Sequence, residues 1–211
     1  GTGDEFAFGF EADLEGWTNI DNDGDGHVWY HSSLCETNHA VLPATSHTGV
    51  GHVVGESYCN GTNQALNPDN YLVSPQKYNI GGSSVLSFWA CAQDASFPAE
   101  HFGVAISTTG NTSASDFTTI QEWTLTAKST GEKKARGLNA SGAWYEYTCD
   151  LSAYAGQQVW IAIRHFNVSD QFIIIIDDMT LTNGAKGDRS RQYFSVYRQN
   201  LINENCAAFE P

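Results

Sequence analysis

The residues from Asp21 to His27 (DNDGDGH) place three carboxylates at alternate positions in a stretch that also holds two glycines. Calcium takes six to eight oxygen ligands at about 2.3–2.6 Å, and alternating acids on a tight loop can direct several oxygens at one centre. A surface turn without a metal is the alternative for such residues. Because three acids this close together repel one another unless a cation lies among them, the pattern favours a calcium loop.

This loop differs from the helix-loop-helix type of calcium loop. That type requires a bidentate Glu at its twelfth position, whereas the twelfth residue counted from Asp21 is Ser32. Short runs of β-prone residues, 17–20 and 28–30, flank the loop. We therefore expect the loop to join two strands and to take its missing acid from elsewhere in the chain.

The composition excludes two classes of partner. The chain has 211 residues, and 24 acidic against 10 basic residues give a net charge of −14, which argues against binding to nucleic acid. The longest apolar run, Phe172 to Ile176, is far short of the ~20 residues that span a bilayer. Twenty glycines and many aromatic residues, with few charges, indicate an all-β secreted or surface domain.

Short strand-like runs separated by turn residues recur along the chain, a pattern typical of a β-sandwich. Alternation puts Leu86, Phe88, Ala90 and Ala92 on one face of their strand. The run 172–176 is apolar on both faces and is therefore expected in the middle of a sheet. Strands are predicted at residues 6–10, 28–31, 50–56, 70–74, 85–92, 102–107, 119–125, 144–150, 159–166 and 172–182, and alternation puts Val159, Ile161 and Ile163 on one face, opposite Trp160 and Arg164.

Two adjacent acids, Asp177 and Asp178, directly follow the buried run. Neighbouring residues on a regular strand face opposite sides, so one of the two acids can reach a metal at the rim of the sheet. A polar stop to an aggregation-prone strand is the other interpretation. The residues alone leave both open.

Five cysteines are too few for a disulfide scaffold. Cys91 and Cys149 lie in predicted strands and are interpreted as small core residues. Cys35 and Cys59 lie in polar stretches and could pair in an oxidising compartment. A change to small and basic residues after Asn183 predicts a domain of residues 1–183 followed by a linker and tail, 184–211, too short for a second core.

Several motifs follow one another along the chain. They are residues 16–18 (GWT) with the Asp-rich loop, 66–75 (LNPDNYLVSP), 86–94 (LSFWACAQD), 99–102 (AEHF) with 107–111 (STTGN), and 164–166 (RHF) with 176–178 (IDD). In these motifs the chain, from about residue 6 to 182, resembles the cleaved-adhesin domains of gingipain-type proteases and haemagglutinins of Bacteroidetes. The tail at 194–198 (FSVYR) resembles the first strand of a fibronectin-type module.

The resemblance implies an all-β jelly-roll sandwich with two structural calcium ions. It also implies a non-catalytic adhesin or haemagglutinin-type module, secreted or on a bacterial cell surface, with roles in cell adhesion and virulence. The expected partners are host extracellular or erythrocyte-surface proteins, or glycans, and the isolated domain is expected to be a monomer. The ligands implied for one calcium are Gly9 (carbonyl), Glu11, Asp21, Asp23, Asp25 and His27 (carbonyl), and those for the other are Asn67, Asp177 and Asp178 with oxygens of the turn from Ser46 to Thr48.

Two other functions compete with adhesion. Glu11 and Glu15 fit the short Glu-x-Asp-x-Glu pattern of laminarinase-like glycosidases, in which a strand holds nucleophile and acid about 5–5.5 Å apart. A carbohydrate-binding module with structural calcium would instead present a platform of exposed rings. The candidate rings are Trp89, Trp123, Trp144, Trp160, Tyr145, Tyr147 and Tyr154.

No nucleophile elbow or zinc motif is present in the sequence, so we expect no enzyme. The ligand surface is expected in the loops at one end of the sandwich, residues 36–47 and 93–100. There Phe97 and Pro98 are predicted to expose an aromatic ring on a rigid turn.

Overall fold

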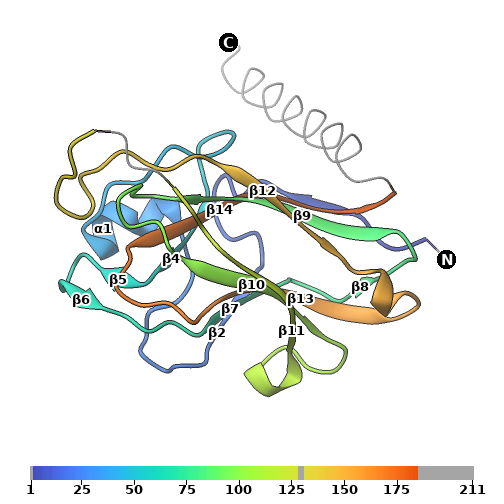
Figure 1. The fold of residues 1–211 in the computed structure, drawn as a ribbon. Helices are drawn as coiled ribbons and strands as arrows, with labels where there is room; N and C mark the ends of the chain where they lie inside the picture. Colours follow the sequence, from blue (N-terminus) through green and yellow to red (C-terminus); the bar gives the residue numbers. More distant parts are fainter. Residues whose placement is uncertain (1, 128–130, 185–211) are drawn as a thin grey trace, which may run out of the picture.

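The protein, described by a computed structural model for residues 2–127 and 131–184, is a sandwich of two antiparallel sheets (Figure 1). The first sheet has the order β12-β9-β14-β4-β3, with β1 beside β14, and the second has the order β11-β10-β13-β7-β2, with β8 beside β13. The predicted boundary after Asn183 and the tail at 194–198 lie at and beyond the end of the described residues. The first sheet comprises β1 (Phe6–Phe8), β3 (Tyr30–His31), β4 (Val53–Glu56), β9 (Ser84–Ala92), β12 (Tyr145–Asp150) and β14 (Ile173–Asn183).

The second sheet and the connections complete the described elements. All ten predicted strands are present, with ends that differ by a few residues. The second sheet comprises β2 (Thr18–Asp21), β7 (Asn70–Val73), β8 (Tyr78–Asn79), β10 (His101–Ser107), β11 (Thr118–Thr124) and β13 (Gln158–His165). The connections hold β5 (Tyr58–Cys59), β6 (Gln64–Ala65), the helix α1 (Cys35–His39) and the 3-10 turns η1 (Ser32–Leu34), η2 (Ala114–Asp116) and η3 (Ser152–Tyr154).

The main hydrophobic core lies between the two sheets. The predicted alternation is confirmed, since Leu86, Phe88, Ala90 and Ala92 of β9 all belong to this core. Val159, Ile161 and Ile163 of β13 belong to it as well, whereas Trp160 packs on the outer face of the second sheet. Phe88 is central because its ring contacts three other rings, those of Phe102, Trp123 and Tyr147.

A second hydrophobic cluster lies on the outer face of the first sheet. The connection from β3 to β4, which carries α1, covers Ile173 and Ile175 of β14 with residues that include Cys35 and Val41. β14 pairs with β9 on one side and β4 on the other. Burial on both faces explains the unbroken apolar run, and the predicted position in mid-sheet is confirmed.

The cysteines differ in part from the expectation. Cys91 and Cys149 are buried in strands, as predicted. Cys35 and Cys59 are also buried, in α1 and β5, and not in exposed polar loops. All four cysteines in the described ranges are free thiols. Within the same ranges no helix combines the length and the apolar character needed to cross a membrane.

Replacing Phe88 with Ala is expected to lower the free energy of unfolding by about 3–5 kcal/mol, because it leaves a large cavity between the sheets. Chemical denaturation monitored by circular dichroism measures this loss. Tyr145→Ala is the matched control, since Tyr145 is 43% exposed and its loss should change stability by about 0.5 kcal/mol or less. Equal effects of the two variants would contradict the assignment of the core.

Candidate metal centres

The two acids of β14 lie on a bulge in the middle of the strand. β14 continues to Asn183, and its pairing with β9 shifts register between Asp177 and Thr180. Asp178 has a left-handed backbone, with φ of 49°. The strand therefore does not stop at these acids, and the expectation that they face opposite sides is wrong, because the bulge turns both carboxylates toward one loop.

That loop is the turn around Thr48. The Thr48 backbone N–H donates to Asp177 Oδ2 at 3.2 Å, and the Thr48 hydroxyl donates to Asp178 Oδ1 at 2.8 Å. His47 Nδ1 lies 2.7 Å from Asp178 Oδ2. The turn and the two acids meet as the resemblance implied.

Burial makes this position electrostatically costly for a bare anion. Asp177 and Asp178 are 0% and 1% exposed. Burial, reinforced by the neighbouring Asp178 carboxylate, raises the pKa of Asp177 to about 9. At neutral pH the pair must therefore share its site with a proton or a cation.

Glu11 contacts the same turn. Its carboxylate accepts the Val50 N–H at 2.7 Å. Burial, followed by the Asp178 charge, raises the pKa of Glu11 above its ordinary value. We call Glu11, Asp177 and Asp178 the buried acid centre. The structure places Glu11 here and not in the cluster of Asp21, Asp23 and Asp25, to which the resemblance assigned it.

Two glycines permit this approach of the chain to the buried acid centre. A Cβ on Gly49, which has φ of 63°, would collide with the Glu11 carboxylate. A Cβ on Gly51 would collide with the backbone of Phe10 and Glu11. Glycine at positions 49 and 51 therefore allows this turn to pack directly against Phe10 and Glu11.

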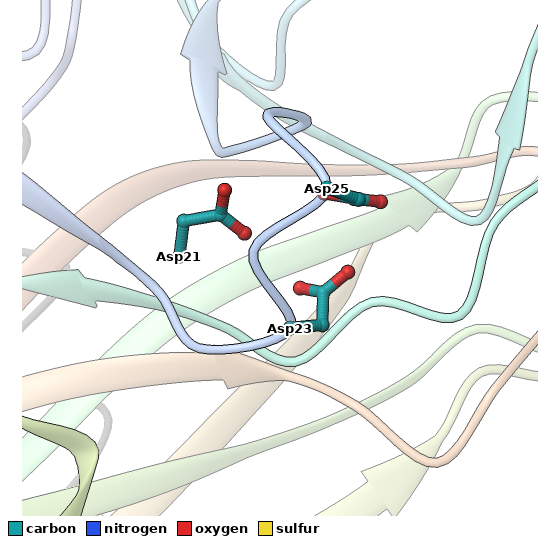
Figure 2. A group of neighbouring side chains, drawn as sticks. All are labelled: Asp21, Asp23 and Asp25. Carbon is teal, nitrogen blue, oxygen red and sulfur yellow. The ribbon is translucent and has the colours of Figure 1, made fainter.

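The exposed acid loop joins β2 to β3, as predicted, and Figure 2 shows its three carboxylates around the turn. One oxygen of each of Asp21, Asp23 and Asp25 lies within 4.8 Å of the others. Asp21 accepts the N–H groups of Gly24 and Gly26 at 3.1 and 2.8 Å, and both glycines have positive φ. Burial and the two neighbouring acids raise the pKa of Asp23 to about 6.

An ion pair supports the exposed acid loop from the second sheet. The Asp69 backbone N–H donates to Asp23 Oδ1 at 3.0 Å, and the Asn22 amide donates to Asp69 Oδ2 at 2.7 Å. Arg164 Nε of β13 donates to Asp69 Oδ1 at 2.8 Å. Sequence reasoning missed Asp69 as a support, although its place in the motif 66–75 was a signal.

The expected carbonyl ligands lie in different surroundings. Gly9 is buried directly after β1, one residue before Phe10, whose N–H donates to the Glu15 carboxylate. His27 remains at the end of the exposed acid loop, where its N–H donates to Asp25 Oδ1 at 2.8 Å.

The remaining two expected ligands, Ser46 and Asn67, have different surroundings. Ser46 is buried next to the turn, and its hydroxyl lies 2.8 Å from His52 Nδ1. Asn67 is exposed and lies two residues before Asp69, which contacts the exposed acid loop. Among the contacts of residues 2–127 and 131–184, none joins Asn67 to Asp177 or Asp178.

The glycosidase pattern does not acquire catalytic geometry. β1 ends at Phe8, so that Glu11 and Glu15 lie in the following loop and not on one strand face. Glu15 Oε2 accepts the Phe10 N–H at 2.9 Å. Glu15 thus holds the backbone of its own loop, whereas Glu11 holds the turn at Val50.

The aromatic side chains form no flat platform in the described part of the chain. Of the seven rings considered, Tyr145 alone is exposed, and the other six are half-buried. Trp123 and Tyr147 pack on the main core, and one face of Trp89 is covered by His47 with ring centroids 4.0 Å apart. This arrangement disfavours a glycan platform.

Phe97 is not the exposed ring that the sequence predicted. Both Phe97 and Pro98 are half-buried, and Phe97 packs against the second hydrophobic cluster. The Arg136 guanidinium and the Lys133 ammonium each lie 4.5 Å from the centre of its ring. The exposed apolar side chain in this neighbourhood is that of Leu138, at 69%.

Comparison with known proteins places the chain among adhesin domains. The profile of the Cleaved Adhesin Domain matches residues 8–181. Hemagglutinin A of Porphyromonas gingivalis is 38% identical over 192 residues, which cover 89% of this chain and 8% of that protein. Lys-gingipain W83 of the same organism is 35% identical over 192 residues, which cover 87% of this chain and 10% of that protein. The chain therefore spans a tenth or less of these relatives.

Solved structures match over nearly their whole length. The K3 cleaved adhesin domain of Lys-gingipain superposes with a TM-score of 0.72 and 38% identity, covering 85% of this chain and 98% of that one. The K1 domain gives a TM-score of 0.70 and 34% identity, covering 86% and 99%. The described sandwich thus corresponds to one such domain.

In chelator, the melting temperature is expected to fall as pH rises from about 4 to about 9. Asp177 has an ordinary pKa of 3.8 when unfolded and about 9 when folded, so the folded state binds the extra proton and loses that stabilisation as pH rises. Asp177→Asn should flatten this slope, since it stays neutral at every pH. Differential scanning calorimetry across this range measures both. A wild-type slope no steeper than that of the variant would contradict the prediction.

Proposed function

The chain belongs to the cleaved adhesin domain family and is an adhesin-type binding module; we propose that calcium holds it together and that it binds host-cell proteins without catalysis. The observation that carries the calcium part is the buried acid centre. It joins three segments, the loop after β1, the turn at residues 46–50 and the bulge in β14, through carboxylates that pair with no lysine or arginine of residues 2–127 and 131–184.

The donor set suits calcium. Glu11, Asp177 and Asp178 offer hard carboxylate oxygens, and the 46–50 turn adds hydroxyl and carbonyl oxygens. Calcium bound there would offset two of the three negative charges and replace the proton that Asp177 otherwise keeps. Asp21, Asp23 and Asp25 would hold a second, more exposed calcium.

Calcium dependence connects the fold to its location. Extracellular calcium, at millimolar levels, fills even sites with dissociation constants near 10⁻⁴–10⁻³ M, whereas cytosolic calcium does not. A domain with an exposed acid loop of this kind is therefore suited to a secreted protein or a bacterial cell surface. Surface placement also agrees with the haemagglutinin and gingipain relatives.

We place the ligand surface at the loops that surround Gln93. The Gln93 side-chain amide donates to the Leu42 carbonyl at 3.0 Å, and the Ser141 hydroxyl donates to the Gln93 carbonyl at 2.9 Å. These contacts join loops that expose Leu42 at 70% and Leu138 at 69%. Exposed leucines on ordered loops suit a protein partner better than a sugar, which binds on flat exposed rings.

Metal-free protein is expected to bind two calcium ions and to melt several degrees higher when they are bound. Asp23→Asn should remove the exposed site and Asp177→Asn the buried one, each leaving one calcium per chain. Equilibrium dialysis gives the stoichiometry and calorimetry the melting temperature. Identical melting of metal-free and calcium-saturated protein would contradict the calcium proposal.

Exchanging both Leu42 and Leu138 for Ser is expected to weaken binding to erythrocytes about tenfold, equivalent to about 1.4 kcal/mol. The matched control is Val50→Ser, because Val50 is 83% exposed but lies on the turn at the buried acid centre. Flow cytometry with labelled domain, in calcium, measures the binding. Equal loss in the control would place the ligand surface elsewhere.

The non-catalytic part of the proposal is tested with polysaccharides and proteins as substrates. The purified domain should release no product. Hydrolysis that disappears in Glu15→Gln would overturn this part while leaving the calcium proposal intact.

A further inference from the structure

A third group of metal-binding side chains lies beneath α1, away from both acid centres. Cys35 and His39 are four residues apart on this helix and so share one face. His39 Nδ1 lies 2.6 Å from Glu56 Oε1 of β4. The His39 ring also stacks on Tyr30 of β3, with centroids 3.8 Å apart and planes 4° from parallel.

Two polar atoms in this group are buried without a partner. Glu56 is 5% exposed, and its Oε2 accepts no hydrogen bond. The Tyr30 hydroxyl faces both the Glu56 carboxylate and the Cys35 thiol, yet it forms no well-shaped hydrogen bond with either. Buried polar atoms of native proteins are nearly always matched, so an unmatched carboxylate oxygen beside a thiol indicates a missing partner.

We infer that Cys35, His39 and Glu56 bind one zinc ion. Thiolate sulfur, imidazole nitrogen and carboxylate oxygen are the ligands that zinc takes in tetrahedral sites, and the fourth position is left for water or the Tyr30 hydroxyl. Calcium does not suit this group, because it selects oxygen ligands only. The zinc site is independent of the calcium centres and of the proposed ligand surface.

Zinc binding requires a small rearrangement. In the described residues, Asp21, Asp23 and Asp25 are the one group of three whose ligand atoms already lie within 4.8 Å, so the Cys35 thiol must move closer to the His39 and Glu56 atoms. The His39 and Glu56 atoms, now 2.6 Å apart, would separate to roughly 3.3 Å around a zinc with bonds of about 2.0–2.1 Å. The His39 side chain is 20% exposed and gives the ion a way in.

The zinc site would fasten the cover of the second hydrophobic cluster. α1 has five residues, too few for a helix to be stable alone. One metal would join α1, which helps to cover Ile173 and Ile175 of β14, to β3 and β4. The site thus has a structural role that the buried acid centre, at the other end of the same connection, does not supply.

The test adds Co²⁺, a spectroscopic substitute for zinc, to full-length, reduced, calcium-saturated protein. We expect a thiolate-to-cobalt charge-transfer band in the near ultraviolet that saturates at one equivalent and disappears when zinc is added. Cys35→Ser should abolish the band, and His39→Gln should weaken cobalt binding at least tenfold. The acid centres contribute nothing to such a band because they contain no sulfur.

Cys91→Ser is the matched control, since Cys91 is buried in the same hydrophobic cluster but its thiol donates to the Gly142 carbonyl. Its band should be unchanged. If Cys35→Ser does not fold, His39→Gln, which alters a partly exposed side chain, still decides the matter. Absence of the band in wild-type protein, or a band that survives in His39→Gln with unchanged affinity, would overturn the inference.

Discussion

The rest of the structure depends on the burial of two adjacent carboxylates, Asp177 and Asp178, in the middle of the longest strand. A bulge in β14 turns both toward the turn at residues 46–50, where Thr48 donates to each of them. The loop after β1 adds Glu11, and Gly49 and Gly51 allow it to come close. The loop after β1, the turn at residues 46–50 and the bulge in β14, which lie far apart in the sequence, therefore meet at the buried acid centre.

The two acid groups differ in what their charges require. The exposed acid loop is open to solvent, and Asp21 already accepts two backbone N–H groups, so that its carboxylates tolerate the absence of a metal. Asp177 and Asp178 are closed to solvent, and although Asp177 accepts the Thr48 N–H, it keeps a proton when no cation is present. We therefore assign the larger effect on folding to the buried acid centre and a smaller, local effect to the exposed loop.

The strand pattern was predictable because alternation and burial act within each strand. Leu86, Phe88 and Ala90 follow from the pleat alone, and the isoleucine run of β14 follows from its cover on both faces. The short helix α1 was missed because five residues carry no readable periodicity. Local patterns were thus a sufficient guide to the ten predicted strands but not to the helix that covers the first sheet.

The assembly of the sites was less predictable, because it depends on contacts between distant residues. A register shift between Asp177 and Thr180 leaves no local signature, so the two acids were expected on opposite faces. Glu11 was grouped with the nearer acids of the loop, although its contacts run to Val50. Phe97 was expected to be exposed because nothing near it in sequence reveals that Arg136 covers its ring.

The measurement that tests the account most directly is the proton release that accompanies calcium binding at pH 7.5. Titration calorimetry of metal-free protein in two buffers of different ionisation enthalpy gives the number of protons released for each calcium bound. Since Asp177 has a pKa of about 9, calcium at the buried acid centre should displace about one proton, and Asp177→Asn should remove that release. Calcium binding without proton release, or an equal release from the variant, would contradict the account.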